Sequence, residues 1–130
     1  MVRETLFRGK TDKNDNWVYG SLNNTDHQFP EIMYCDKNWS VCSTSIKPET
    51  IGVFTGLTDK NGTKIFEGDV VKVSGVAKAK IIWNNEDACF AFDYGKDGRP
   101  LCLDFIDDTG IEVIGNIYDN PDLLEEDKWF

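Results

Sequence analysis

Residues 52–74 constrain the fold more than any other part of the chain. Their sequence, GVFTGLTDKNGTKIFEGDVVKVS, holds short apolar runs that are separated by turn residues and leave no room for a helix. Residues 59–62 read Asp-Lys-Asn-Gly, and these residue types tolerate the positive φ angles of a tight turn. β-branched residues dominate residues 70–73, as is typical of strands. The stretch therefore predicts successive strands joined by tight turns, and a mainly β fold.

The second half of the chain continues this pattern. Strand-forming runs recur at about ten-residue spacing, which is typical of a β-sandwich or a small barrel; they lie at residues 70–74, 79–84, 88–94, 100–105 and 111–118. Strands of this number and length can close into a small SH3-like barrel. Apolar residues at alternate positions are expected to fill its interior: Ile81, Trp83, Phe90, Phe92, Tyr94, Leu101, Leu103 and Phe105.

The first half is richer in loops and offers a thinner core. Short strands are expected at residues 5–9, 17–22, 31–35 and 41–45, and the first two of them form a β-hairpin. Near the other end, Asn120-Pro121-Asp122 combines an N-cap, a proline and an acid, which predicts a short C-terminal helix. The expected domains are an N-terminal β-rich subdomain (1–50), the SH3-like barrel (51–118) and an acidic tail (119–130).

The net charge of -9 is concentrated in one half of the chain. Residues 1–65 hold 8 Lys/Arg and 8 Asp/Glu, whereas residues 66–130 hold 6 and 15. Because nucleic-acid affinity depends on clustered Lys and Arg, direct nucleic-acid binding is disfavoured. An acidic face can instead attract a basic protein or imitate a nucleic acid, and it can equally be an ordinary solvated surface.

The N-terminal sequence and the hydropathy pattern bear on location. The N-terminus lacks the apolar core of a signal peptide, and no run approaches the ~18 apolar residues of a membrane span. We therefore expect an intracellular protein without a membrane partner.

No cofactor or metal is expected from the residue spacing. The four cysteines, Cys35, Cys42, Cys89 and Cys102, include no Cys-x-x-Cys pair, so reduced structural thiols are favoured over zinc, with a disulfide or a reactive thiol as the alternatives. The single histidine, His27, lies in a polar loop with no evident partner. Asp59, Asn61 and Thr63 resemble the start of a calcium loop, but the Gly and Glu that such a loop requires further on are missing.

Two catalytic possibilities involve the acids that precede the last strand. Asp108-Thr109-Gly110 resembles the motif of aspartic proteases, but the charged Asp107 precedes it and the sequence fits a turn better. Asp104, Asp107 and Asp108 offer ligands for Mg²⁺ in a metal-assisted hydrolase, although the sequence locates neither a base nor a substrate pocket. We therefore expect that the protein is not an enzyme.

Aromatic residues outside the expected core form the candidate interaction surface. They are Trp17, Tyr19, Trp39, Trp129 and Phe130. The last two follow an acidic run at the end of the chain, so they must either fold back or meet another chain.

Three segments of the chain form a distinctive combination. The first is Leu-Phe-Arg-Gly-Lys at residues 6–10 with Trp-Val-Tyr-Gly at 17–20, the second runs from residue 54 to residue 71, and the third is Glu-Val-Ile-Gly-Asn-Ile-Tyr at 112–118 with Asn-Pro at 120–121. Together these segments resemble the YopX family of phage and prophage proteins. The resemblance implies a phage accessory protein of the bacterial cytoplasm with a mostly β fold that includes an SH3-like barrel. It brings no established activity, so it carries over no catalytic residue.

The leading hypothesis is a non-enzymatic, homo-oligomeric module that binds a host or phage protein. The alternatives are an acidic decoy of a nucleic-acid-binding host protein and the metal-assisted hydrolase that uses Asp104, Asp107 and Asp108.

Overall fold

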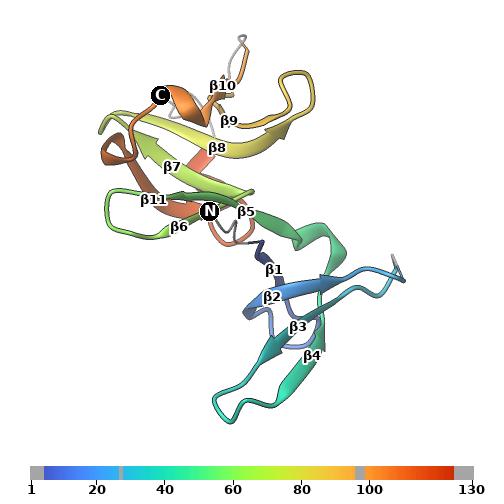
Figure 1. The fold of residues 1–130 in the computed structure, drawn as a ribbon. Helices are drawn as coiled ribbons and strands as arrows, with labels where there is room; N and C mark the ends of the chain where they lie inside the picture. The colour runs from blue at the N-terminus through green and yellow to red at the C-terminus, as the bar shows by residue number, and fades with distance from the viewer. Residues whose placement is uncertain (1–4, 27, 96–98, 125–130) are drawn as a thin grey trace. The chain divides into compact units, whose positions relative to one another are not determined.

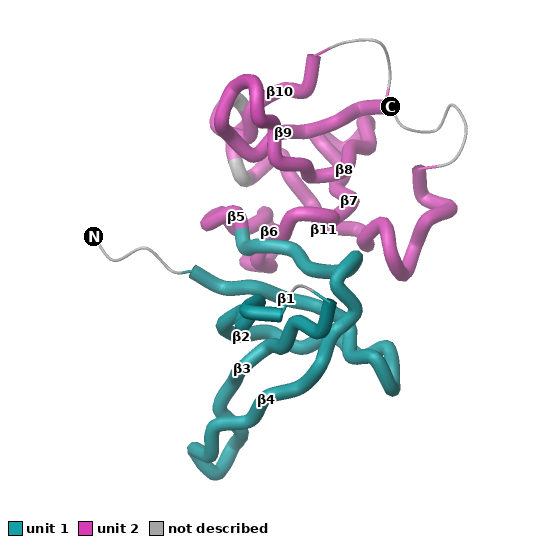
Figure 2. Tube along the Cα trace, turned by 90° about the vertical axis from the view of Figure 1, so that its right-hand side faces the viewer, with its two compact units in different colours: residues 1–54 teal, residues 55–130 magenta. Residues whose placement is uncertain are grey.

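The protein is described by a computed structural model that covers residues 5–26, 28–95 and 99–124. The chain divides into two compact units, Met1–Phe54 (unit 1) and Thr55–Phe130 (unit 2), which are coloured separately in Figure 2. Both units are built mainly from antiparallel strands, so the predicted mainly β class is confirmed. None of the helices in the described ranges is long and apolar enough to cross a membrane.

Unit 1 is a meander of short strands. They are β1 (Phe7–Lys10), β2 (Trp17–Asn23), β3 (Glu31–Cys35) and β4 (Val41–Ser45), in the spatial order β4-β3-β2-β1 (Figure 1). A 3-10 turn at Pro48–Thr50 leads into β5 (Gly52–Thr58), whose first residues pair with β1 and whose remainder belongs to unit 2. The expected hairpin of β1 and β2 is present, with Gly9 opposite Val18.

The core of unit 1 is small and depends on close backbone approach. Ile32 and Ile46 are almost fully buried, at 0% and 1% exposure. Gly9 lies so close to Ile46 that an added Cβ would stand 2.5 Å from its Cδ1 atom, and a Cβ on Gly20 would stand 2.1 Å from the carbonyl oxygen of Met33. Glycine at these two positions therefore lets the sheet pack around its few large side chains.

Unit 2 is a second antiparallel sheet. Its strands are β7 (Asp69–Val73), β8 (Ala77–Asn84), β9 (Cys89–Asp93), β10 (Leu101–Cys102) and β11 (Ile111–Asn116), in the order β10-β9-β8-β7-β11. β6 (Lys64–Phe66) pairs with β5, and 3-10 turns occupy Leu103–Phe105, Asp108–Gly110 and Pro121–Leu124. A register shift between Val113 and Gly115 marks an irregularity in β11.

One cluster of apolar side chains forms the core of unit 2. Its buried members are Ile65, Val71, Val73, Ala79, Ile81, Phe92, Leu103 and Ile111. The alternation of apolar residues thus correctly predicted that Ile81, Phe92 and Leu103 are interior. Trp83 was wrongly predicted to join them: it is 44% exposed and packs edge-on against Phe90, with 5.1 Å between ring centroids.

The buried carboxylate of Asp59 connects a turn to a distant strand in unit 2. Asp59 is only 4% exposed. Its Oδ1 accepts hydrogen bonds from the backbone N–H groups of Asn61 (2.8 Å) and Thr63 (2.9 Å), and its Oδ2 accepts one from Val113 (2.9 Å). Burial raises the pKa of Asp59, but the three N–H donors and the charge of Lys60 outweigh it and hold the pKa below its usual value. Both oxygens are thus occupied by backbone donors, which suits a turn rather than a calcium ligand.

Several expected details of the second half differ from the structure. The described strands form open sheets without a closed barrel, since β10 and β11 lie at the two ends of the strand order; the SH3-like detail stays a prediction. The strand expected at 100–105 ends at Cys102 and passes into a 3-10 turn. A four-residue 3-10 turn, Pro121–Leu124, stands where the C-terminal helix was expected, and residues 125–130 lie outside the described part of the chain.

Candidate interaction surface

One face of the unit 1 sheet carries several exposed side chains. Directly paired residues of antiparallel strands lie on the same face, and side chains alternate along each strand. The pairs Arg8 with Tyr19, Lys10 with Trp17, Ser21 with Met33 and Cys35 with Val41 therefore share one face. We call its accessible part the exposed face, and define it by Tyr19, Ser21, Met33, Cys35, Val41 and Ser43.

Apolar groups on this face are open to solvent. Tyr19 is 46% exposed, Met33 39% and Val41 71%, whereas Ile32 and Ile46 on the opposite face are buried. Single exposed apolar residues are ordinary on protein surfaces, so the grouping of several on one small sheet face makes it the candidate interaction surface.

Trp17 has a different environment from its neighbours on this side of the sheet. It is half-buried, with the guanidinium carbon of Arg8 4.4 Å from its ring centroid and the Lys10 Nζ atom 5.6 Å away. Arg8 itself is 4% exposed. Trp17 thus stacks against the two cations of β1 and stabilises the hairpin through cation–π contacts.

Trp39 stands at the tip of the β3–β4 hairpin. It is 86% exposed and has a φ of 64°, a left-handed conformation that is rare for a residue of this size. The turn is fixed by Asp36, whose Oδ1 accepts hydrogen bonds from the N–H groups of Asn38 (2.8 Å) and Ser40 (3.0 Å). These bonds, Ser40 first, lower the pKa of Asp36. An ordered turn therefore presents an indole ring to solvent.

The other two candidate aromatics, Trp129 and Phe130, lie outside the described residues. Of the five expected interaction residues, the structure thus describes Trp17, Tyr19 and Trp39, all in unit 1.

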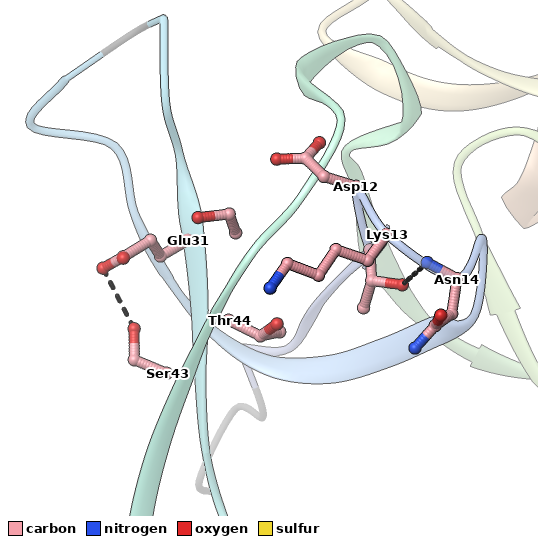
Figure 3. Close-up of a pocket in the computed structure, with 8 residues that line it drawn as sticks. Asp12, Lys13, Asn14, Glu31, Ser43 and Thr44 are labelled. Carbon is pink, nitrogen blue, oxygen red and sulfur yellow. Dashed lines mark hydrogen bonds between the residues drawn. The ribbon is translucent and has the colours of Figure 1, made fainter.

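A polar groove of about 360 Å³ runs beside β4. It is lined by Thr11, Asp12, Lys13, Asn14, Glu31, Ser43, Thr44 and Ser45 (Figure 3). The Ser43 hydroxyl donates to Glu31 Oε1 over 2.9 Å. Lys13 points from the turn toward the β4 side of the groove (Figure 3). A groove lined by hydroxyl and charged groups suits a polar ligand rather than an apolar one.

The comparison with known families decides the identity. A family model described as YopX protein matches residues 6–125. The chain belongs to the YopX family. This confirms the resemblance predicted from the three sequence segments. In the structure, the second and third of these segments meet through the hydrogen bond from Val113 to Asp59.

Among solved structures, this YopX family chain is similar to the crystal structure of protein EF1440 from Enterococcus faecalis. The two share 22% sequence identity with a TM-score of 0.60, and the match covers 95% of this chain and 100% of that chain. At this identity the likeness shows the fold alone. No curated protein matches the chain.

Of the acids proposed for a metal site in this YopX protein, Asp107 serves turn geometry. Asp104 and Asp107 are exposed. Asp107 Oδ1 accepts a hydrogen bond from Thr109 N (3.2 Å), and its carbonyl accepts one from Gly110 N (2.8 Å). The Asp108 side chain is not described, and among the side chains that are, no group of three or more His, Cys, Asp or Glu could hold a metal ion. The hydrolase stays a prediction. His27 lies outside the described residues.

Several acids of the second half lie close to cations. Ion pairs among the described residues include Lys60–Glu112 at 3.6 Å, Lys80–Asp93 at 3.9 Å and Arg99–Asp87 at 2.9 Å. Interspersed charges of opposite sign weaken the electrostatic field of an acidic face. The decoy hypothesis, which requires continuous negative charge, stays a prediction.

All four cysteines are free thiols. Cys35 is exposed and the other three are half-buried. A hydrogen bond with Cys102, followed by burial, raises the pKa of Cys89 to about 11, so this thiol stays protonated near neutral pH.

Proposed function

We propose that this YopX family protein is a non-enzymatic, homo-oligomeric protein-binding module, and that its partner site consists of Trp39 with the exposed face of unit 1. The observation that carries the proposal is Trp39. A tryptophan that is 86% exposed and held at φ 64° gains almost no burial, while its left-handed backbone costs about 1–2 kcal/mol. An interaction with another molecule supplies the burial that the isolated chain does not give it.

The exposed face extends this site along the sheet. Val41 begins β4 immediately after the hairpin tip, and Met33 lies on the neighbouring strand. Together with Tyr19 they supply apolar and aromatic contacts, the residue types that dominate binding energy at protein interfaces.

The family resemblance supports the biological setting. We place the module in the bacterial cytoplasm as a phage or prophage accessory protein that binds a host or phage protein. The resemblance also underlies the proposal of an SH3-like arrangement for the strands of unit 2. The turn role of Asp107 supports a non-enzymatic protein.

Comparison of two exposed tryptophans tests the partner site. Trp39→Ser removes the proposed hot spot, and Trp83→Ser is the matched control, because Trp83 is also exposed but lies in unit 2. Loss of a hot spot costs at least about 2 kcal/mol, or about 30-fold in affinity.

The measurement is quantitative affinity capture from bacterial lysate followed by titration of the captured protein. We expect that a protein captured by the wild type and by Trp83→Ser binds Trp39→Ser at least ~30-fold more weakly. Equal affinity for all three would show that the partner site lies elsewhere.

A further inference from the structure

The outer edge of β4 has backbone groups in position to pair with another strand. β4 ends the strand order among the described residues. On the inner side, Ile46 N donates to Pro30 O over 3.1 Å; on the outer side, Ser45 O accepts from Asp12 N over 3.3 Å. Backbone groups of successive residues point to opposite sides of a strand. Counting back from Ser45, the N–H and C=O groups of Ser43 therefore point outward.

The side chains of β4 itself do not protect this edge, and the lysine that points toward the strand, Lys13, belongs to the adjoining turn. Soluble proteins block edge strands with lysine, proline, inward-pointing charges or bulges. Val41–Ser45 reads Val-Cys-Ser-Thr-Ser, with no charge and no proline, and its five residues pair with β3 without a register shift. By the same alternation as Ser43, the backbone groups of Val41 point outward, and its side chain is 71% exposed. The edge is therefore competent to pair.

The turn that contains Asp12 limits how much of the edge is open. Because the Asp12 N–H already donates to the Ser45 carbonyl, an added strand can pair only with Val41 and Ser43. An antiparallel copy of the same segment meets this limit. Val41 then stands opposite Ser43 of the second copy, and Cys42 stands opposite its own equivalent on a two-fold axis.

We propose that β4 of one molecule pairs antiparallel with β4 of a second copy, which joins two unit 1 sheets into one. This inference deepens the proposed function, because it rests on self-association and names the surface responsible. The pairing satisfies the outward backbone groups of both copies. It also places the exposed Val41 of each copy in the interface.

Charge favours a second copy at this surface. Two copies of a chain with net charge -9 repel each other, and the excess of acids lies in the second half, at residues 66–130. β4 is uncharged and residues 1–65 are balanced, so the repulsion is least there. A strongly charged partner strand gains no opposite charge from β4 itself, whereas an identical strand has a complementary backbone and adds no charge repulsion.

A proline substitution tests the pairing. Ser43→Pro removes the outward N–H and keeps the inward bonds to β3, and Ser43→Thr is the matched control that retains the N–H. By sedimentation equilibrium at micromolar concentrations, we expect wild type and Ser43→Thr to form dimers with similar dissociation constants. We expect Ser43→Pro to raise the dissociation constant at least about tenfold, because it abolishes a short ladder.

Hydrogen exchange of the wild-type protein gives an independent readout that does not depend on a variant folding. The Ser43 amide should exchange at least about tenfold more slowly at concentrations where dimer dominates than where monomer dominates. If the wild type formed an oligomer but the exchange rate of its Ser43 amide did not change, the proposed β4 pairing would be wrong. The proposal of a homo-oligomeric module would still hold. A strict monomer would overturn self-association itself, whereas the Trp39 test reports separately on the partner site.

Discussion

Replacement of Asp59 tests whether one buried carboxylate stabilises unit 2 across a long sequence separation. Asp59→Ala removes the acceptor of three backbone N–H groups. Hydrogen bonds to a charged acceptor contribute about 1.5–3 kcal/mol each. Asn61 and Thr63 are exposed and their N–H groups can bind water instead, so the half-buried Val113 N–H accounts for most of the loss. We expect Asp59→Ala to lower the free energy of unfolding of unit 2 by about 3 kcal/mol.

Asp59→Asn separates charge from shape. The amide keeps an oxygen for Asn61 and Thr63 but turns its NH₂ group toward the N–H of Val113, so two donors face each other. We expect a loss of about 2 kcal/mol at neutral pH, since a buried donor is left unsatisfied.

The pH dependence of this loss has a definite sign. The folded-state pKa of Asp59 is lowered from 3.8, so its carboxylate stabilises the fold at pH values above the unfolded pKa. That contribution disappears as the pH falls through the folded pKa, because a protonated carboxyl carries a donor of its own. The protonated wild type then resembles the Asp59→Asn variant, whose side-chain amide also presents a donor. The difference between wild type and Asp59→Asn should therefore shrink as the pH falls below about 4.

The assay is urea denaturation, monitored through the amide NMR signals of the core residues Ile81 and Phe92, which report on unit 2 alone. A tryptophan signal would not separate the units, because tryptophans lie in both. Glu86→Gln is the control, since Glu86 is an exposed acid of unit 2 and its replacement should change stability by less than about 0.5 kcal/mol. If Asp59→Ala behaved like this control, or if the wild-type advantage over Asp59→Asn did not change with pH, the account of Asp59 would be refuted.

Three further predictions concern Trp39, two glycines of unit 1 and two cysteines. Trp39→Gly should raise the stability of unit 1 by about 0.5 kcal/mol in urea denaturation, because glycine adopts positive φ freely and little burial is lost. Gly20→Ala should cost about 3 kcal/mol and Gly9→Ala about 1 kcal/mol by the same assay, because the first clashes with backbone and the second with the end of a flexible side chain. In iodoacetamide labelling mapped by mass spectrometry, Cys35 should react before Cys89, whose rate should keep rising until the pH nears its pKa of about 11.

Local pattern predicted the strands well where turns bound them on both sides. β3 and β4 occupy residues 31–35 and 41–45 as expected, because a loop with Pro30 precedes the first and the Asp36 turn separates the two. The strand expected at 100–105 failed at Cys102, because the chain turns there into a 3-10 helix that buries Leu103. Periodicity correctly places Trp83 on the same face of β8 as Ile81. It does not predict that Trp83, near the end of the strand, is exposed while Ile81 is buried.

The interactions that the sequence did not reveal are long-range or depend on loop geometry. No local signal connects Asp59 to Val113, which lies 54 residues away. The turn at residues 36–40 was predicted, but not the residue with positive φ. Asn38 is chemically better suited to a positive φ than Trp39, yet in the structure Trp39 has the positive φ. The two bonds to Asp36 fix the path of the loop and so decide this.

The backbone at Trp39 and the open edge of β4 belong to the same hairpin and have the same energetic character. Each lowers the stability or solubility of an isolated molecule: one holds a large residue in a left-handed conformation, the other leaves a strand edge without protective charge. If both exist for binding, variants that relieve them should lose association without losing stability. Trp39→Gly should then weaken partner binding, and Ser43→Pro should weaken self-association, while unit 1 stays folded. Gly20→Ala should weaken either interaction only by unfolding unit 1. A hairpin with a purely structural role would instead lose stability and association together in all three variants.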